Sequence, residues 1–130
     1  MSQQHLPHVH VIATGGTIAS RPVSPTQTTG YSQVALTADD LVAGIPGIET
    51  RVRLTTEQLL ATASSALEDA DLLRLSQRVA DVLDDETVDG VVITHGTDTM
   101  EESAFFLNLT VHSEKPVILT GSMRPSTVLS

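Results

Sequence analysis

The sequence predicts an α/β domain with a mostly parallel sheet and flanking helices. Three segments each contain, in order, apolar residues, a threonine, glycine and a hydroxyl residue: Val9–Thr17, Val91–Thr97 and Val117–Ser122. Helical patterns precede the second and third segments, and this alternation implies right-handed crossovers between parallel strands. Ligands of open α/β folds bind beyond the carboxyl ends of the strands. We therefore expect these three ends to gather hydroxyls, amides and one carboxylate around one small pocket.

The composition fits one soluble domain with an aliphatic core. The chain has 130 residues, 40% of them hydrophobic, but only two Phe, one Tyr and no Trp. A Val, Leu, Ile and Ala core is typical of sheets covered on both faces. The net charge of −9 argues against nucleic acid as a partner, because phosphate binding needs clustered Lys and Arg. The lack of cysteine excludes disulfides, zinc–thiolate sites and a thiol nucleophile.

The two ends of the chain give further expectations. The first seven residues lack the basic and apolar regions of a signal peptide, and no stretch approaches the ~18 apolar residues of a membrane span. We expect no membrane contact and a cytoplasmic location, or a periplasmic one if a leader has been removed. The segment after Ser122 begins a new element and stops at Ser130. We therefore expect the chain to be part of a longer protein.

The first half contains a strand, a long loop and a short helix. Apolar residues predict a strand over 8–13, and a loop over 20–32 is long enough to be functional. The capping-box pattern Thr37–Asp40 opens a short helix that Gly44 and Pro46 end. Alternating residues from Ile48 to Leu54 predict a half-exposed strand.

The second half predicts two amphipathic helices between buried strands. Apolar residues at helical spacing follow Leu67, with acidic residues in the first turn. Asp89-Gly90 then turns the chain into a strand over Val91–Thr94. Thr99 and Glu102 form a second capping-box pattern before another apolar stripe, and Lys115-Pro116 opens the last strand.

The turn Thr14-Gly15-Gly16-Thr17 allows two interpretations. As structure, the glycines permit a tight turn and Thr17 is a helix N-cap. As chemistry, Thr17 offers a hydroxyl nucleophile, and backbone amides bared by the glycines can stabilise an oxyanion. It is not a phosphate-binding loop, because no Gly-Lys-Ser/Thr follows.

The segment His95-Gly96-Thr97-Asp98-Thr99 carries more chemistry. Either Asp98 or Thr99 is suited to cap the following helix, and His95 is more typical of a buried structural group than of a base. A carboxylate at Asp98 is favoured by the helix dipole and could bind an ammonium group. The other histidines, at positions 5, 8, 10 and 112, lack metal-ligand spacing, and no metal site is predicted.

Together the two glycine turns carry a family resemblance. Val11–Ala19 and Gly90–Met100 resemble the two signature segments of the bacterial-type L-asparaginase and glutaminase-asparaginase family, and Lys115–Pro125 resembles its next strand and turn. The likeness runs in order through essentially the whole chain. It implies that residues 1–130 are the incomplete N-terminal domain of a two-domain fold. It also implies hydrolysis of the side-chain amide of L-asparagine, and of L-glutamine as a second candidate, to the acid and ammonia through an acyl-enzyme.

The resemblance assigns roles to individual residues. Thr17 matches the nucleophilic threonine, and Tyr31 matches the lid tyrosine that helps to activate it. Thr97 and Asp98 match the second threonine and the aspartate that binds the substrate ammonium group.

The α-carboxylate ligand of the family falls on Ser64 or on its neighbour Ser65. The sequence departs from the family pattern here, because Ser65 stands where an acidic or amide residue is usual. Both serines also fit a second role as caps of the helix near Leu67. Backbone amides at Gly16 and Gly96 are the candidates for stabilising an oxyanion.

Other parts of the family's machinery have no counterpart in the chain. The family places a lysine beyond the Gly-Ser-Met-Arg-Pro turn, which completes a relay with Thr97 and an aspartate, and Lys115 lies at the wrong end of its strand to replace it. The family's C-terminal domain, with an acidic residue given by a neighbouring subunit, is also missing. The resemblance implies no cofactor and a homotetramer for the full-length protein. We expect this chain alone to be inactive.

A non-catalytic function fits the same residues. If Thr17 is only structural, the domain would be a non-catalytic module that binds a small amino acid and transmits a change of shape. A receiver-like phosphoacceptor domain is disfavoured, because the first strand ends in Ala13-Thr14 rather than in an acidic pair.

Overall fold

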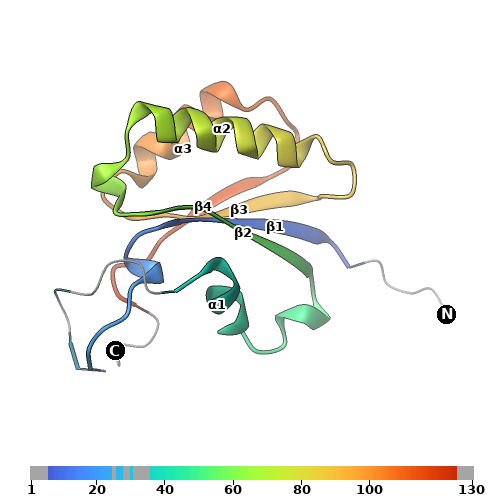
Figure 1. Cartoon of the computed structure of the whole chain (residues 1–130). Coiled ribbons are helices and arrows are strands. Elements are labelled where there is room, and N and C mark those ends of the chain that lie inside the picture. Colours follow the sequence, from blue (N-terminus) through green and yellow to red (C-terminus); the bar gives the residue numbers. More distant parts are fainter. Residues whose placement is uncertain (1–5, 25, 28–29, 31–35, 126–130) are drawn as a thin grey trace.

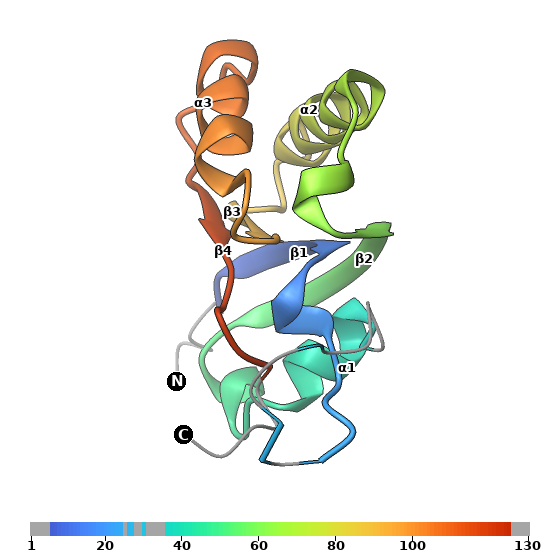
Figure 2. The ribbon, with the colours of Figure 1, turned by 90° about the vertical axis from the view of Figure 1, so that its left-hand side faces the viewer.

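A computed structural model describes residues 6–24, 26–27, 30 and 36–125. Its sheet has four strands in the order β2-β1-β3-β4, and every neighbouring pair is parallel. Helices α2 and α3 cover one face and α1 lies on the other (Figures 1 and 2). The strands are β1 His8–Gly15, β2 Arg53–Thr62, β3 Gly90–Thr94 and β4 Val117–Thr120, and the helices are α1 Ala38–Ala43, α2 Asp69–Leu83 and α3 Met100–Thr110. The predicted α/β class with a parallel sheet is confirmed.

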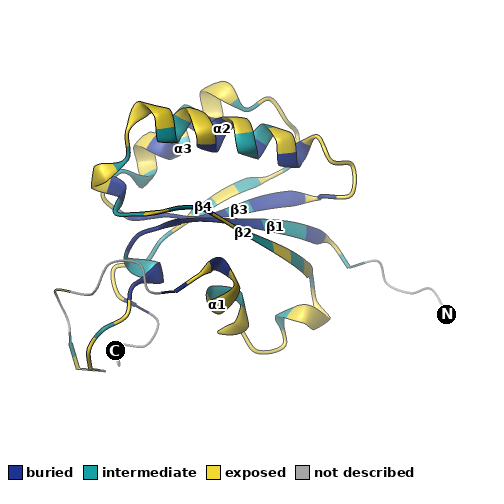
Figure 3. Cartoon of the chain, in the orientation of Figure 1, coloured by how far each residue is buried: buried dark blue, intermediate teal, exposed yellow. Residues whose placement is uncertain are grey.

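The core lies between the sheet and the α2–α3 layer. Ile12 and Ile93, from the two central strands, are fully buried there against α2 and α3. The inward side of α2 is buried and its outer side exposed, as its apolar spacing predicts (Figure 3). The remaining core residues are also aliphatic: Leu59, Leu75, Val79, Val82, Leu83, Val88, Val91 and Leu107.

The predicted capping box of the short helix is confirmed. The Thr37 hydroxyl accepts the Asp40 N–H at 3.2 Å, and the Asp40 carboxylate accepts the Thr37 N–H at 2.9 Å. Two N–H groups that lack partners within the helix are thereby satisfied. The helix ends at Gly44, as expected.

The strand predicted over 48–54 is wrong. Ile48–Thr50 forms a short 3-10 helix after Gly47, whose φ of +76° turns the chain, and the strand begins only at Arg53. The alternation of apolar residues has a different cause, because Ile48 and Leu54 both line a cavity beneath α1. Among the described helices, none is long and apolar enough to cross a membrane.

Candidate functional site

The carboxyl ends of β1 and β3 meet at two glycines. Gly16, with φ +83°, lies so close to the second turn that a Cβ atom on it would be 2.4 Å from the Gly96 Cα. Gly15, with φ +111°, would place a Cβ 2.4 Å from the Thr62 carbonyl oxygen at the end of β2. Only glycine permits these approaches and these dihedral angles. Thr17 and Thr97, which follow Gly16 and Gly96 directly, are therefore carried by turns in contact.

The end of β4 joins the same cluster. A Cβ on Gly121 would lie 2.6 Å from the His95 carbonyl oxygen and 3.2 Å from the Thr97 Cγ2 atom. The His95 N–H also donates to the Thr120 carbonyl at 2.8 Å. The three strand ends singled out by the sequence are thus assembled at one edge of the sheet.

Ser64 brings the end of β2 into the cluster. Its Oγ accepts the Asp98 N–H at 3.1 Å, and its carbonyl accepts the Thr99 hydroxyl at 3.0 Å. The predicted capping box of Thr99 and Glu102 is therefore wrong, because the Thr99 hydroxyl is bonded to the Ser64 segment and makes no cap hydrogen bond.

The two candidate serines differ in their surroundings. Ser64 is buried, whereas Ser65 is exposed. Neither serine caps α2. The N-cap of α2 is Glu68, whose backbone N–H donates to the Asp71 carboxylate at 3.0 Å. The capping role left open for both serines does not occur.

Three candidate side chains have polar groups without a hydrogen-bond partner in the described part of the chain. Among the described residues, none forms a hydrogen bond with the hydroxyls of Thr17 or Thr97, or with the Asp98 carboxylate. By contrast, the nearby Thr14 hydroxyl donates to the Thr94 carbonyl at 2.9 Å, and the Ser20 hydroxyl donates to the Gly16 carbonyl. Thr17 is the first residue of a 3-10 helix whose N-cap is Gly16, so it is not the cap. The Thr17 side chain is half-buried, and the structural role expected for it, that of a helix N-cap, belongs to Gly16 instead.

His95 has a structural position, as its sequence context favoured. It is fully buried, with Nδ1 2.7 Å from the Gly96 carbonyl oxygen and Nε2 2.9 Å from the Ser103 Oγ. The carbonyl only accepts, so Nδ1 carries the hydrogen and Nε2 accepts the Ser103 hydroxyl. The ring thereby links the Gly96 turn to α3.

The remaining predicted residues are placed as follows. The Gly16 N–H donates to the Thr62 carbonyl at 3.1 Å, so it is occupied within the protein. Lys115 precedes β4 at the opposite end of the sheet, where its Nζ donates to the Leu83 and Asp85 carbonyls, each at 2.8 Å. Tyr31 lies outside the described residues.

The strand β2 was not predicted over its actual residues, so only the family resemblance pointed to Ser64 at its end. Thr62-Ala63-Ser64 follows the apolar residues Leu59-Leu60-Ala61, so this segment repeats the order of apolar run, threonine and hydroxyl residue without the glycine. That likeness was the available signal.

A cavity of about 520 Å³ lies elsewhere, between α1 and the sheet. Its walls are mostly aliphatic, and Asp40 is its one charged lining residue among the described part of the chain. The amino-acid ligand that the family resemblance leads us to expect is zwitterionic and would need partners for both of its charges. The polar cluster at the strand ends, rather than this cavity, is therefore the candidate site.

Comparisons with known proteins identify the family of the chain. The family described as "Asparaginase, N-terminal" matches residues 8–130. The chain is 49% identical to a glutaminase-asparaginase of Acinetobacter glutaminasificans, over 95% of this chain and 37% of that protein. It is 43% identical to L-asparaginase 2 of Bacillus subtilis (strain 168), over 98% of this chain and 34% of that protein. The chain thus spans about a third of the length of these relatives.

A solved structure is similar as well. The crystal structure of a probable cytoplasmic L-asparaginase from Campylobacter jejuni matches with a TM-score of 0.89 and 47% identity. The match covers 95% of this chain and 37% of that one.

Proposed function

The chain belongs to the asparaginase family, and from this premise we propose that it supplies the nucleophile-bearing part of an L-asparaginase site. The proposed reaction hydrolyses the side-chain amide of L-asparagine to L-aspartate and ammonia. L-glutamine is a second candidate substrate, because two kinds of relative are named, L-asparaginases and glutaminase-asparaginases. The contact between Gly16 and Gly96 carries the proposal, since it brings the Thr17 and Thr97 turns together.

The proposed chemistry begins at Thr17. Its Oγ1 attacks the amide carbon while a base takes the hydroxyl proton. That proton is passed to the amide nitrogen as the C–N bond breaks, so that ammonia leaves and an ester remains. Water then attacks the resulting ester and regenerates the hydroxyl. A threonine hydroxyl needs such a base. We propose Tyr31 as the residue that helps to activate it, from the family resemblance, and Thr97 as the second hydroxyl at the reacting amide.

Binding of the substrate's charged groups is proposed for Asp98 and Ser64. The Asp98 carboxylate would pair with the α-ammonium group, and its lack of a partner among the described residues supports this role. Ser64 Oγ accepts the Asp98 N–H, so its own hydrogen points elsewhere and can be donated to the α-carboxylate. This supports Ser64 over the exposed Ser65 as the carboxylate ligand. For the oxyanion, Gly96 is the better candidate, because the Gly16 N–H is bonded to Thr62.

The proposal includes groups outside the chain. A relay lysine, a C-terminal domain and a tetramer are expected of the full-length protein from the resemblance. We accordingly propose that residues 1–130 form an N-terminal domain with little or no activity alone. Measurable ammonia release from L-asparagine by the purified chain would contradict this.

The catalytic assignment is tested in a chimaera that joins this chain to the unmatched remainder of the Acinetobacter relative. Ammonia release from L-asparagine is expected to be lost in Thr17→Ala and retained in part in Thr17→Ser, which keeps a hydroxyl. Added hydroxylamine should divert the acyl-enzyme to aspartyl hydroxamate. If Thr17→Ala leaves turnover unchanged, Thr17 is not the nucleophile. If the chimaera binds L-asparagine without turnover, the chain is a binding module instead.

A further inference from the structure

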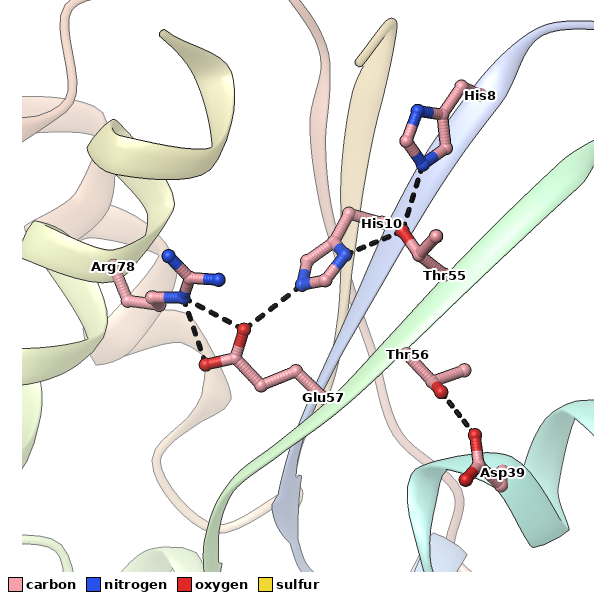
Figure 4. A network of polar contacts seen from close by, with 7 residues as sticks. All are labelled: His8, His10, Asp39, Thr55, Thr56, Glu57 and Arg78. Carbon is pink, nitrogen blue, oxygen red and sulfur yellow. Dashed lines mark hydrogen bonds and ion pairs between the residues drawn. The ribbon is translucent and has the colours of Figure 1, made fainter. Parts of the chain in front are cut away.

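A row of polar side chains runs along β1 and β2 (Figure 4). An Arg53 guanidinium nitrogen lies 2.6 Å from His8 Nδ1, and His8 Nε2 lies 2.9 Å from the Thr55 Oγ1. The same Oγ1 lies 2.7 Å from His10 Nδ1, and His10 Nε2 lies 3.1 Å from the Glu57 carboxylate. Five side chains on two adjacent strands thus form one continuous chain of hydrogen bonds.

The hydrogen atoms of this hydrogen-bond network have only one arrangement when both imidazoles are neutral. Arg53 can only donate, so His8 Nδ1 is the acceptor and His8 Nε2 carries the hydrogen. That hydrogen goes to Thr55, whose single hydroxyl hydrogen is then donated to His10 Nδ1. His10 Nε2 carries a hydrogen and donates it to Glu57, which accepts only. The reverse arrangement would set a lone pair of His10 against the Glu57 carboxylate.

His8 has a second partner at the same nitrogen. Its Nδ1 also lies 3.0 Å from the Thr87 carbonyl oxygen, which can only accept. Nδ1 cannot accept from Arg53 and donate to Thr87 at the same time. The structure therefore holds His8 between two mutually exclusive partners.

We propose that His8, Thr55 and His10 form a proton-controlled switch whose hydrogen bonds reverse direction when His10 takes up one proton. The added proton gives His10 a hydrogen on Nδ1, which it donates to Thr55. Thr55 then donates to His8 Nε2, and His8 exchanges its Nε2 hydrogen with solvent for one on Nδ1, directed at Thr87. The Arg53 guanidinium, now facing an N–H group, leaves His8. Glu57 accepts from His10 Nε2 in both states.

The charged groups around this hydrogen-bond network are compatible with both states of His10, neutral and protonated. Arg78 from α2 donates its Nε–H to both Glu57 oxygens, at 2.9 and 2.8 Å. Burial raises the pKa of Glu57, but hydrogen bonds from Arg78 and His10 outweigh it and hold the pKa below its usual value, so Glu57 stays an acceptor.

The connection from α2 to β3 faces His8 from the other side. The Asp89 carboxylate accepts the His8 backbone N–H at 2.7 Å, which fixes the strand while its ring changes partner. The Asp85 carboxylate is bonded to Thr87, beside the carbonyl that would receive the His8 hydrogen. His8 is 6% exposed and the His10 side chain is 12% exposed, so both rings are shielded but not closed off from the solvent with which they exchange protons.

Nitrogen-15 NMR of the histidine rings in the full chain tests the switch, because neutral Nδ1–H and Nε2–H tautomers have different shifts. As pH is lowered until His10 becomes protonated, His8 should pass from the Nε2–H to the Nδ1–H tautomer with the same midpoint as the protonation of His10. If His8 keeps one tautomer while His10 titrates, or itself becomes doubly protonated at that midpoint, the proposal fails.

Variants isolate the cause. His10→Gln keeps a donor and an acceptor but cannot gain a proton, so His8 should hold its Nε2–H tautomer throughout. The matched control is His112→Gln, at an exposed histidine beyond α3, which should leave the His8 transition unchanged. Arg53→Gln removes the cation that opposes the Nδ1–H form and should shift the midpoint to higher pH. A His8 transition that survives His10→Gln would overturn the proposal.

Discussion

Replacing Gly16 by alanine should drive apart the two turns that carry Thr17 and Thr97. The new Cβ would lie 2.4 Å from the Gly96 Cα and 2.5 Å from its nitrogen. Both are backbone atoms, so relief requires movement of a whole turn rather than a change of rotamer. The φ of +83° adds strain for any residue with a side chain.

The size of the effect follows from these two contributions. Positive φ costs an L-residue about 1–2 kcal/mol, and overpacking adds about 1–3 kcal/mol, which together give about 2–5 kcal/mol. Gly47 is the control for a positive φ without a clash, because its φ is +76° and no atom lies within 4 Å of its added Cβ. Its ψ of 7° places it in the left-handed α region, whereas the combination of φ +83° and ψ −179° at Gly16 is adopted almost only by glycine and adds to the cost there. Gly47→Ala should therefore cost only the strain, about 1–2 kcal/mol.

Urea unfolding of both variants at pH 7 measures the difference. Gly16→Ala should lower the midpoint clearly more than Gly47→Ala at an unchanged slope. Equal losses of stability in the two variants would refute the reasoning, because the contact between the turns would then contribute nothing.

Three further predictions concern single interactions. Ser103→Ala should destabilise the fold by about 1–3 kcal/mol in urea unfolding, because it leaves the fully buried His95 Nε2 without a partner. Thr37→Ala removes the hydroxyl that accepts the Asp40 N–H and should cost about 1 kcal/mol, whereas Thr37→Ser should restore most of it. The pKa of Glu57 lies below its ordinary value of 4.5, so the unfolded state binds more protons at this group than the folded state. The contribution of the Glu57 carboxylate to the free energy of unfolding is complete above pH 4.5 and is lost as pH falls through the folded-state pKa. At pH 7 the native chain should therefore be more stable than Glu57→Gln by about 1 kcal/mol, and this difference should disappear in acid. A gap that widens with falling pH would contradict this sign.

Much of the fold could be predicted because local signals and tertiary structure agree. The Thr37 capping box, the apolar spacing of α2 and the buried strands all specify the elements that form. The start of β2 could not be read in the same way. Apolar residues at Ile48 and Leu54 alternate like a strand, but they face a cavity from either side of a turn at Gly47.

The candidate site was only partly visible in the sequence. Glycine turns after apolar runs predict strand ends at one edge, and three such ends do meet there. The bond between Ser64 and Asp98 joins residues 34 positions apart, and no local pattern reports it. The pairing of His8 and His10 with Thr55 likewise depends on the register between β1 and β2, which the sequence does not reveal.

A crystal structure of the Thr17→Ala chimaera with bound L-asparagine would test the central claim most directly. The account predicts the α-ammonium group at about 2.7–3.2 Å from the Asp98 carboxylate, with the side-chain amide directed at position 17 and at Thr97. L-asparagine bound in the cavity beneath α1, or at the strand ends with its amide directed away from position 17, would contradict it.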